Sequence, residues 1–260
     1  MLAEFSAVRW ERAYRRVAGT AFLRVPFYRD QWVAAGQALN EPEPTRSAAL
    51  AGQLHRLCPF ARPYDPSREP SPWIGDGRDL RAALAMVAVP RRVPVLEVRA
   101  AVLDRRALGW NGPRYGVVLA PDANVVDDGR RRKLNLAALA LAADAGQAIL
   151  VGERSALDAV LPEFGGIRVI TVERMTAARA VQEQGVAYDP HLGYFAATVH
   201  GCGKTHLLWR RFHARPAGGM LAVTALRRTR PVLLDVVPDG GDTLTTAACP
   251  RHGTPIIEMR

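Results

Sequence analysis

Apolar residues recur at helical spacing along the first part of the chain. Between Glu4 and Gly36 this pattern predicts helix, which Pro26 is expected to break. Residues Gln37 to Asp79 are rich in Pro, Ser and Arg, and that composition predicts a long irregular connection. Leu80 to Val89 then predicts a short helix.

Strand and helix signals alternate through the middle of the chain. Four short apolar runs predict strands, at Val93 to Val98, Tyr115 to Leu119, Gln147 to Val151 and Ile167 to Val172. Three segments predict helices, at Lys133 to Ala145, Ser155 to Leu161 and Thr176 to Gln184. Gly146 is expected to end the first of these helices and Ser155 to cap the second. This alternation predicts a parallel sheet with right-handed crossovers.

The pattern changes to β from Tyr188 onward. Strands are predicted at 206–213, 220–226 and 232–237, separated by turns rich in Gly and Pro. The last two strands fit an antiparallel meander. The expected fold class is therefore α/β, with a core of parallel sheet and helices followed by a C-terminal antiparallel β region.

Two short Cys/His pairs stand out within this β region. Three residues separate Cys202 from His206, and two separate Cys249 from His252, so each pair can reach one ion. Thiolate and imidazole together suit Zn²⁺, and four protein ligands fill a tetrahedral shell. A filled shell leaves no position for a reactive water. The sequence therefore predicts a structural zinc site.

The alternative is that these four are ordinary loop residues. A single accidental pair is easy among six His and three Cys, but two pairs beside glycines are less easy, and we favour the metal. His200 is an alternative ligand, and Cys58 is expected to be a buried apolar cysteine. With this site the chain divides into an N-terminal helical and Pro-rich segment packed on the core (1–90), an α/β core (91–187) and a β-rich, zinc-bound subdomain (188–260).

The same stretch contains a partial match to a nucleotide-binding loop. Residues 200–205 read HGCGKT, but the spacing G-x-x-x-x-G-K-[ST] requires glycine at the position of Thr198. That motif also needs a helix after Thr205, to present its N-terminus to phosphates. The residues that follow predict a strand instead, so a phosphate-binding loop is rejected here.

Composition narrows the classes of function. The chain has 260 residues, 48% of them hydrophobic, with 35 Lys and Arg against 25 Asp and Glu, which gives a formal net charge of +10. Arginine-rich codon usage accounts for much of this charge, and attraction to an acidic partner is the functional alternative. No nucleic-acid-binding signature or membrane-spanning run is present. With no signal peptide recognised and no disulfide framework, a cytoplasmic location is expected.

Several phrases resemble phenylacetate–CoA ligase-like adenylate-forming enzymes. Arg24 to Gly36 (RVPFYRDQWVAAG) is similar to the family's early "VPFYRxxxxxAG" phrase, and Arg92 to Leu96 to its "lPvltK" phrase. Leu134 to Glu153 resembles a helix and strand ending in "GGE", and Phe164 to Ile170 resembles the "fGvrvyd" strand. The order of the phrases is kept along the chain.

The resemblance continues to the end of the sequence. Cys202 to His213 is similar to "C…GLHxxxxxfxvE", and Gly219 to Leu226 to "GELVvTsL". Cys249 to Gly253 stands where the family has "CPCG", a phrase with which some members hold zinc. The resemblance implies an adenylate-forming fold and supports the zinc site.

The departures from the family concern its nucleotide machinery. After Arg92 to Leu96 the family has the phosphate loop "TSGTTGxP", and this chain reads EVRAAVLDRRALGWNGPRYG. In register with "YGxTE", Ala177 stands in place of the Glu that binds Mg²⁺, and Asp239 compares only loosely with the ribose-binding Asp of "RYRTGD". The chain ends at Arg260, so the small C-terminal domain with its catalytic Lys is expected to be missing. We therefore expect a trimmed relative without ATP-dependent ligase activity.

The first functional reading is a repurposed acyl-processing protein in biosynthesis, such as that of an antibiotic or another secondary metabolite. It binds an acyl or aryl group, either free or on an acidic carrier protein, and catalyses cyclisation, acyl transfer or amide formation. His191 and Tyr194 are the candidate catalytic residues, with His191 as general base and with Glu173 and Asp235 as further polar groups. The alternative is that His191 belongs to a turn and Tyr194 to a core position, and the sequence favours this alternative.

A second reading is a non-catalytic partner or chaperone of a biosynthetic enzyme. Four aromatic residues near the Pro-rich connection could form its binding edge or pack that connection onto the core: Trp32, Phe60, Tyr64 and Trp73. The third reading is an acyl- or aryl-CoA ligase with unusual motifs. A homodimer is compatible with all three readings, and none of them involves nucleic acid or a membrane.

Overall fold

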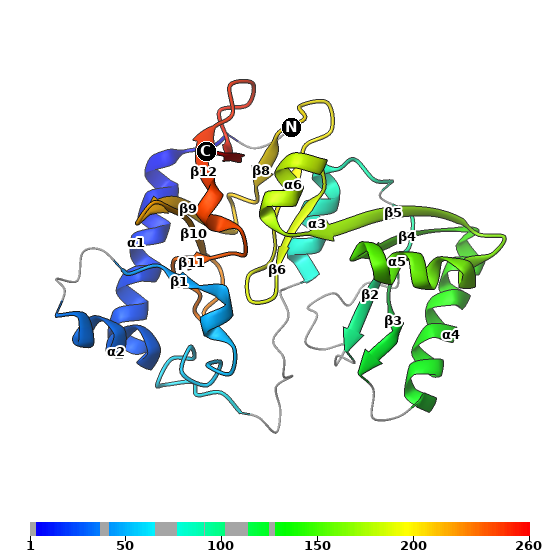
Figure 1. Ribbon diagram of the computed structural model, residues 1–260, viewed down its shortest axis with the longest axis horizontal. Helices are drawn as coiled ribbons and strands as arrows, with labels where there is room; N and C mark the ends of the chain where they lie inside the picture. The colour runs from blue at the N-terminus through cyan, green and yellow to red at the C-terminus, as the bar shows by residue number, and fades with distance from the viewer. Residues whose placement is uncertain (1–3, 37–41, 66–76, 91, 102–113, 125–127) are drawn as a thin grey trace.

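Two β-sheets carry the fold (Figure 1). The computed structural model describes residues 4–36, 42–65, 77–90, 92–101, 114–124 and 128–260. Among these residues the larger sheet has the strand order β12-β13-β8-β7-β6-β5-β4-β2-β3, and the smaller has the order β1-β11-β10-β9. No helix in the described ranges is both long enough and apolar enough to cross a bilayer.

One end of the larger sheet is parallel. Its strands are β2 (Val95–Ala101), β3 (Tyr115–Asn124), β4 (Gln147–Gly152), β5 (Arg168–Met175) and β6 (Val186–Asp189). Two helices, α4 (Asp128–Ala145) and α5 (Arg154–Val160), cover one face of β2, β3 and β4. A 3-10 turn, Leu161–Phe164, leads from α5 to β5. The strand–helix alternation in the sequence has therefore formed the predicted parallel sheet.

The other end of the larger sheet is antiparallel. It continues from β6 through β7 (Gly193–Thr198), β8 (Thr205–Leu207), β13 (Pro255–Met259) and β12 (Leu244–Ala248). The helix α3 (Gly77–Met86) packs on β7, and α6 (Ala177–Glu183) packs on β6, β7 and β13. Strands distant in sequence, β8 and β13, thus become hydrogen-bonded neighbours.

The smaller sheet lies beside the N-terminal helices. It contains β1 (Thr45–Arg46), β9 (Phe212–Ala217), β10 (Met220–Ala225) and β11 (Val236–Val237). Two short 3-10 turns adjoin it, Ser47–Leu50 after β1 and Gly241–Thr243 against β10. The helices α1 (Ala7–Arg24) and α2 (Pro26–Ala35) lie along this sheet on the left of Figure 1, with α1 against β9.

Apolar side chains fill two layers, one on each face of the parallel strands. Leu96 and Val98 of β2 pack with α4 and α5, whereas Val95 packs into the larger core shared with the smaller sheet. Because successive side chains of a strand point to opposite faces, Glu97 and Arg99 share the face of Val95. This alternation places two charged residues inside the larger core.

Several element predictions are confirmed. The N-terminal helix is broken at Pro26, the strands at 95, 115, 147 and 168 begin within two residues of the predicted starts, and Gly146 turns the chain with φ +65°. Cys58 is buried, with 2% of its surface exposed. Thr205 opens the strand β8 and not a helix, which agrees with the rejection of a phosphate loop there.

Other element predictions are wrong. Ser155 lies inside α5, which begins after Glu153 without a side-chain cap. Residues 206–213 form two strands joined by a turn, and only Val236 and Val237 of the stretch 232–237 form a strand. Asp235, with φ +46°, turns the backbone immediately before them. The hairpin of β12 and β13 and the short strand β1 in the Pro-rich connection had no recognised signal.

Candidate functional site

Two turns bring the predicted metal ligands to one place. The turn between β7 and β8 carries Cys202, the strand β8 that follows it carries His206, and the turn between β12 and β13 carries Cys249 and His252. Pairing of His206 with Ile256 across β8 and β13 holds both turns at the same end of the sheet. The four ligand atoms all lie within 4.8 Å of one another, so the cluster could hold a metal ion.

Three glycines shape these turns. Their φ angles are +76°, +69° and +65°, in the left-handed region that side chains disfavour, at Gly201, Gly203 and Gly253. The turns also form internal hydrogen bonds, from the backbone N–H of Cys202 to Val199 and from that of Gly253 to Cys249. The tight backbone curls each pair of ligands toward a common point.

The separations between donor atoms are short. Cys202 Sγ lies 3.4 Å from His206 Nε2 and 3.7 Å from Cys249 Sγ, and Cys249 Sγ lies 3.5 Å from His252 Nδ1. Cys249 and His206 are buried, whereas Cys202 and His252 are partly exposed. The cluster therefore has one side in the protein and one side near solvent.

His206 has a partner on the side away from the cluster. Its Nδ1 lies 2.9 Å from Thr254 Oγ1, so this nitrogen can donate while Nε2 faces the thiols. Burial, and next the proximity of His252, lowers the pKa of His206 to about 4. The ring is thus neutral near pH 7, which is the form that binds metals. His200, the alternative ligand, is not a member of the cluster.

A cleft adjoins the turn between β7 and β8. It has a volume of about 410 Å³ and is lined by Val87, Gln184 and residues 198–203, Cys202 among them. One wall of the cleft is thus the turn that carries the candidate ligand Cys202.

His191 lies in the turn between β6 and β7, in a separate polar cluster. Its Nδ1 is 2.8 Å from Ser47 Oγ, and Ser47 Oγ is 2.9 Å from Asp189 Oδ1. Burial lowers the pKa of His191, and the nearby Asp189 opposes that shift. Ser47 belongs to the smaller sheet's side of the molecule, so this cluster connects the two sheets.

Tyr194 belongs to a different cluster, although only two residues separate it from His191. Its hydroxyl donates to Glu97 Oε1 at 2.6 Å, and the hydroxyl of Tyr115 donates to Glu97 Oε2 at 2.5 Å. Arg99 lies 2.6 Å from Glu97 and Arg174 lies 3.6 Å from it. Burial, followed by the charge of Glu97, raises the pKa of Tyr194 far above its ordinary value. The phenol is therefore a hydrogen-bond donor at neutral pH.

Glu97 is the centre of this second cluster, with 1% of its surface exposed. Burial favours the neutral acid, but Arg99, Arg174 and the two phenols hold the pKa of Glu97 below its ordinary value. The carboxylate is thus charged and surrounded inside the core.

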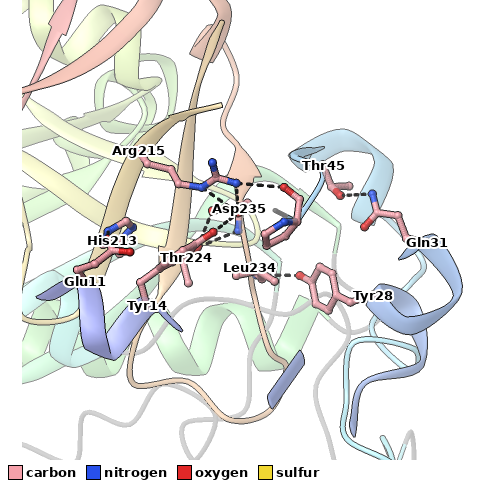
Figure 2. A network of polar contacts seen from close by, with 11 residues as sticks. Glu11, Tyr14, Tyr28, Gln31, Thr45, His213, Arg215, Thr224, Leu234 and Asp235 are labelled. Carbon is pink, nitrogen blue, oxygen red and sulfur yellow. Dashed lines mark hydrogen bonds and ion pairs between the residues drawn. The ribbon is translucent and has the colours of Figure 1, made fainter. Parts of the chain in front are cut away.

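Glu173 and Asp235, which the sequence offered as further polar groups, lie apart from His191. Glu173 pairs with Arg154 and Arg179 near the surface. Asp235 is fully buried in the smaller sheet, where Tyr14 and Arg215 each approach its Oδ2 to 2.8 Å (Figure 2). Glu173 and Asp235 therefore do not join one site with His191.

Among known proteins, similarity to this chain was found only in solved structures. No family model matches the chain, and no curated protein sequence is significantly similar. A solved structure of 2-hydroxyisobutyryl-CoA ligase, in an open conformation with 2-HIB-AMP and CoA, superposes with a TM-score of 0.52 at 14% identity, covering 96% of this chain and 67% of that one. The same ligase in its thioesterification state gives a TM-score of 0.51 at 12% identity, covering 98% and 69%.

The fold resembles that of an adenylate-forming CoA ligase. At this identity the likeness concerns the fold alone, and it agrees with the superfamily that the sequence phrases suggested. The sequence did not indicate Ser47, Glu97 or Thr254 as site residues. Ser47 and Thr254 each pair with a residue more than 40 positions away, so no local motif could have revealed them. Glu97 pairs with Arg99 two positions away, but its contact with Tyr194 depends on long-range pairing.

Proposed function

We propose that this chain is a zinc-stabilised protein of the adenylate-forming fold that processes an acyl or aryl group without ATP. The backbone path of β2 is the main observation that supports the proposed loss of ATP use. Of the stretch compared with the family's Gly- and hydroxyl-rich phosphate loop, residues 97–101 continue a strand and bury Glu97 against Arg99, and residues 102–113 lie outside the described residues. A continuing strand at this place offers no backbone cradle for a triphosphate.

The helix after β5 supports the same proposal. In the position compared with the Mg²⁺-binding Glu stands Ala177, which opens α6 and is 1% exposed. A methyl group supplies no ligand for the cation that offsets the charge of a nucleotide.

We assign the metal as structural Zn²⁺ on the donor set and the spacing. Zn–S and Zn–N bonds of about 2.3 and 2.0 Å at tetrahedral angles separate two sulfurs by about 3.8 Å and a sulfur from a nitrogen by about 3.5 Å. The separations at this site are 3.7 Å between sulfurs and 3.4 and 3.5 Å between sulfur and nitrogen. Two thiolates and two imidazoles fill the shell, so the ion ties the turns together and leaves no position for a substrate.

We further propose His191 as the acceptor of the proton that a nucleophile loses when it adds to the acyl carbonyl, with Tyr194 orienting the buried Glu97 in a separate cluster. An acidic carrier protein that presents the acyl group would suit the charge of the chain. Four arginines lie exposed along α1: Arg9, Arg12, Arg15 and Arg16. Their charge favours association with an acidic surface.

The decisive experiment for ATP use is pyrophosphate release by the purified chain with Mg²⁺, ATP and a panel of acyl and aryl acids. The expected result is release no greater than that of a boiled control, together with a rise in melting temperature when a matching acyl group binds. Pyrophosphate release above background would overturn the proposal and favour a ligase with unusual motifs.

One observation favours the alternative of a non-catalytic partner. Leu23 and Phe60 are apolar side chains that are 68% and 57% exposed, and the backbone of Phe60 is hydrogen-bonded to Arg24, the residue after Leu23. Of the other aromatic residues proposed for a binding edge, Trp32 is buried and Trp73 lies outside the described residues. Substituting Leu23 and Phe60 by Ser should abolish copurification of a partner under this alternative and leave acyl binding unchanged under the main proposal.

A further inference from the structure

Three side chains from two sheets form a continuous hydrogen-bonded chain. Ser47 opens the 3-10 turn that follows β1 of the smaller sheet, whereas Asp189 ends β6 of the larger sheet. Ser47 Oγ lies 2.9 Å from Asp189 Oδ1 and 2.8 Å from His191 Nδ1. Ser47 and Asp189 are 6% and 1% exposed, and the ring of His191 is half-buried.

The carboxylate decides the direction of these hydrogen bonds. Asp189 Oδ1 already accepts from the backbone N–H groups of His191 and Leu192, at 2.8 and 2.9 Å. If the single hydroxyl proton of Ser47 pointed to His191, a lone pair of Ser47 would face the carboxylate at 2.9 Å, which is repulsive. The hydroxyl therefore donates to Asp189 and accepts from His191 Nδ1–H.

A protonated Nδ1 leaves Nε2 of the neutral ring as an acceptor. Among the described residues, no hydrogen bond forms at Nε2 of His191. Ser47 itself is not suited to be a nucleophile, because its hydroxyl is buried and its proton is directed to Asp189.

We infer that Ser47 and Asp189 are positioning residues that hold His191 in the Nδ1–H tautomer, so that Nε2 accepts a proton from a hydroxyl or amine nucleophile on the acyl substrate. This inference rests on the proposed function. In the step, the O–H or N–H bond of the nucleophile breaks as the nucleophile bonds to the acyl carbon, and the Nε2–H bond forms. The bond between the acyl carbon and its leaving group then breaks, and the leaving group takes the proton from Nε2.

The surrounding charges suit this role. When Nε2 takes up a proton, the imidazolium donates through Nδ1 to Ser47, which donates to the Asp189 carboxylate. The nearest cation on the other side is Arg228, which donates to the carbonyls of His191 and Leu192 at 2.9 and 2.7 Å and pairs with Asp79 at 2.8 Å. Arg228 thus fixes the turn, and it shares the carboxylate of Asp79 with Arg211. Burial keeps the pKa of His191 below its ordinary value, so the ring is neutral near pH 7.

The test is nitrogen NMR of isotope-labelled imidazole rings in the full chain, with the signals of His191 assigned by their loss in H191Q. The expected wild-type result at neutral pH is a protonated Nδ1 and an unprotonated Nε2. This measurement needs no substitution at Ser47 or Asp189. Protonation of Nε2 in place of Nδ1 would overturn the inference.

Two variants sharpen the test. Ser47→Ala should move the proton of His191 wholly or partly to Nε2, because the acceptor for Nδ1–H is removed. Asp189→Asn keeps an oxygen that accepts hydrogen bonds but loses the charge, so the pKa of His191 should fall. An unchanged tautomer in Ser47→Ala, or an unchanged or raised pKa in Asp189→Asn, would contradict the relay. The readout does not involve ATP, so its failure is distinguishable from pyrophosphate release.

Discussion

The sulfur atoms of Cys202 and Cys249 lie 3.7 Å apart, although the two residues are 47 positions apart in the chain. Their approach depends on the pairing of β8 with β13, which places two glycine-shaped turns at one end of the larger sheet. Two thiols and two imidazoles meeting at such spacing are the donors of a closed metal shell. The C-terminal hairpin is therefore expected to depend on the ion for its stability.

Removing one ligand should release the metal and destabilise the protein. Cys249→Ala deletes a buried thiolate, and since structural Zn²⁺ can contribute on the order of 10 kcal/mol, a loss of at least about 3 kcal/mol is expected. Urea unfolding followed by circular dichroism measures it. Cys58→Ala is the matched control, because it removes a buried thiol outside the cluster and should leave the metal content unchanged. Equal metal loss in both variants would contradict the site.

The partner of His206 should tune metal affinity. Thr254→Val removes the hydroxyl that meets Nδ1 of His206 at 2.9 Å, and a loss of about 10- to 100-fold in affinity is expected. Competition with a chromogenic chelator measures it. The control is Thr246→Val, which removes a hydroxyl bonded to the backbone of Ile256 in the same hairpin. If the two variants lose affinity equally, the effect belongs to the hairpin and not to His206.

The buried carboxylate of Asp235 should stabilise the contact between α1 and the smaller sheet. It accepts hydrogen bonds from Tyr14, Thr224 and Arg215, as Figure 2 shows. Asp235→Asn suits the left-handed backbone but leaves the Arg215 guanidinium without its counter-charge, so a loss of about 3 kcal/mol is expected.

A surface ion pair provides the control for Asp235. Asp242 pairs with Arg46, and the two side chains are 53% and 62% exposed. Asp242→Asn should change the free energy of unfolding by no more than about 1 kcal/mol, because water screens the pair. Similar losses in both variants would show that Asp235 has no special role.

His213 should make stability fall in mild acid. Its ring stacks on Tyr14 and lies at a tilt to Trp10, with centroids 4.4 and 4.1 Å away, and burial lowers its pKa although Glu11 opposes the shift. Below about pH 6.5 the unfolded chain therefore binds a proton that the folded chain resists, and the free energy of unfolding drops as pH falls. His213→Phe keeps the stacking and should flatten this dependence. An identical slope in the variant, measured by urea unfolding across that range, would contradict the assignment.

The sequence revealed what is local and missed what depends on long-range pairing. The break at Pro26, the turn at Gly146 and the parallel strands follow from short-range periodicity and backbone preference, and these predictions are confirmed. The four metal ligands could be named because each pair is itself a local motif. The contact between Ser47 and His191 could not be predicted, because Ser47 reaches His191 only when β1 joins the smaller sheet beside β11. Glu97 was likewise read only as part of an apolar run, although its charge is compensated by side chains from β5 and β7.

The proposed zinc site is tested most directly by elemental analysis of protein purified without a metal-affinity tag and dialysed against metal-free buffer. We predict one zinc ion per chain in the unsubstituted protein, close to none in Cys249→Ala, and one in Cys58→Ala. An unsubstituted protein without a stoichiometric transition metal would contradict the proposed zinc site.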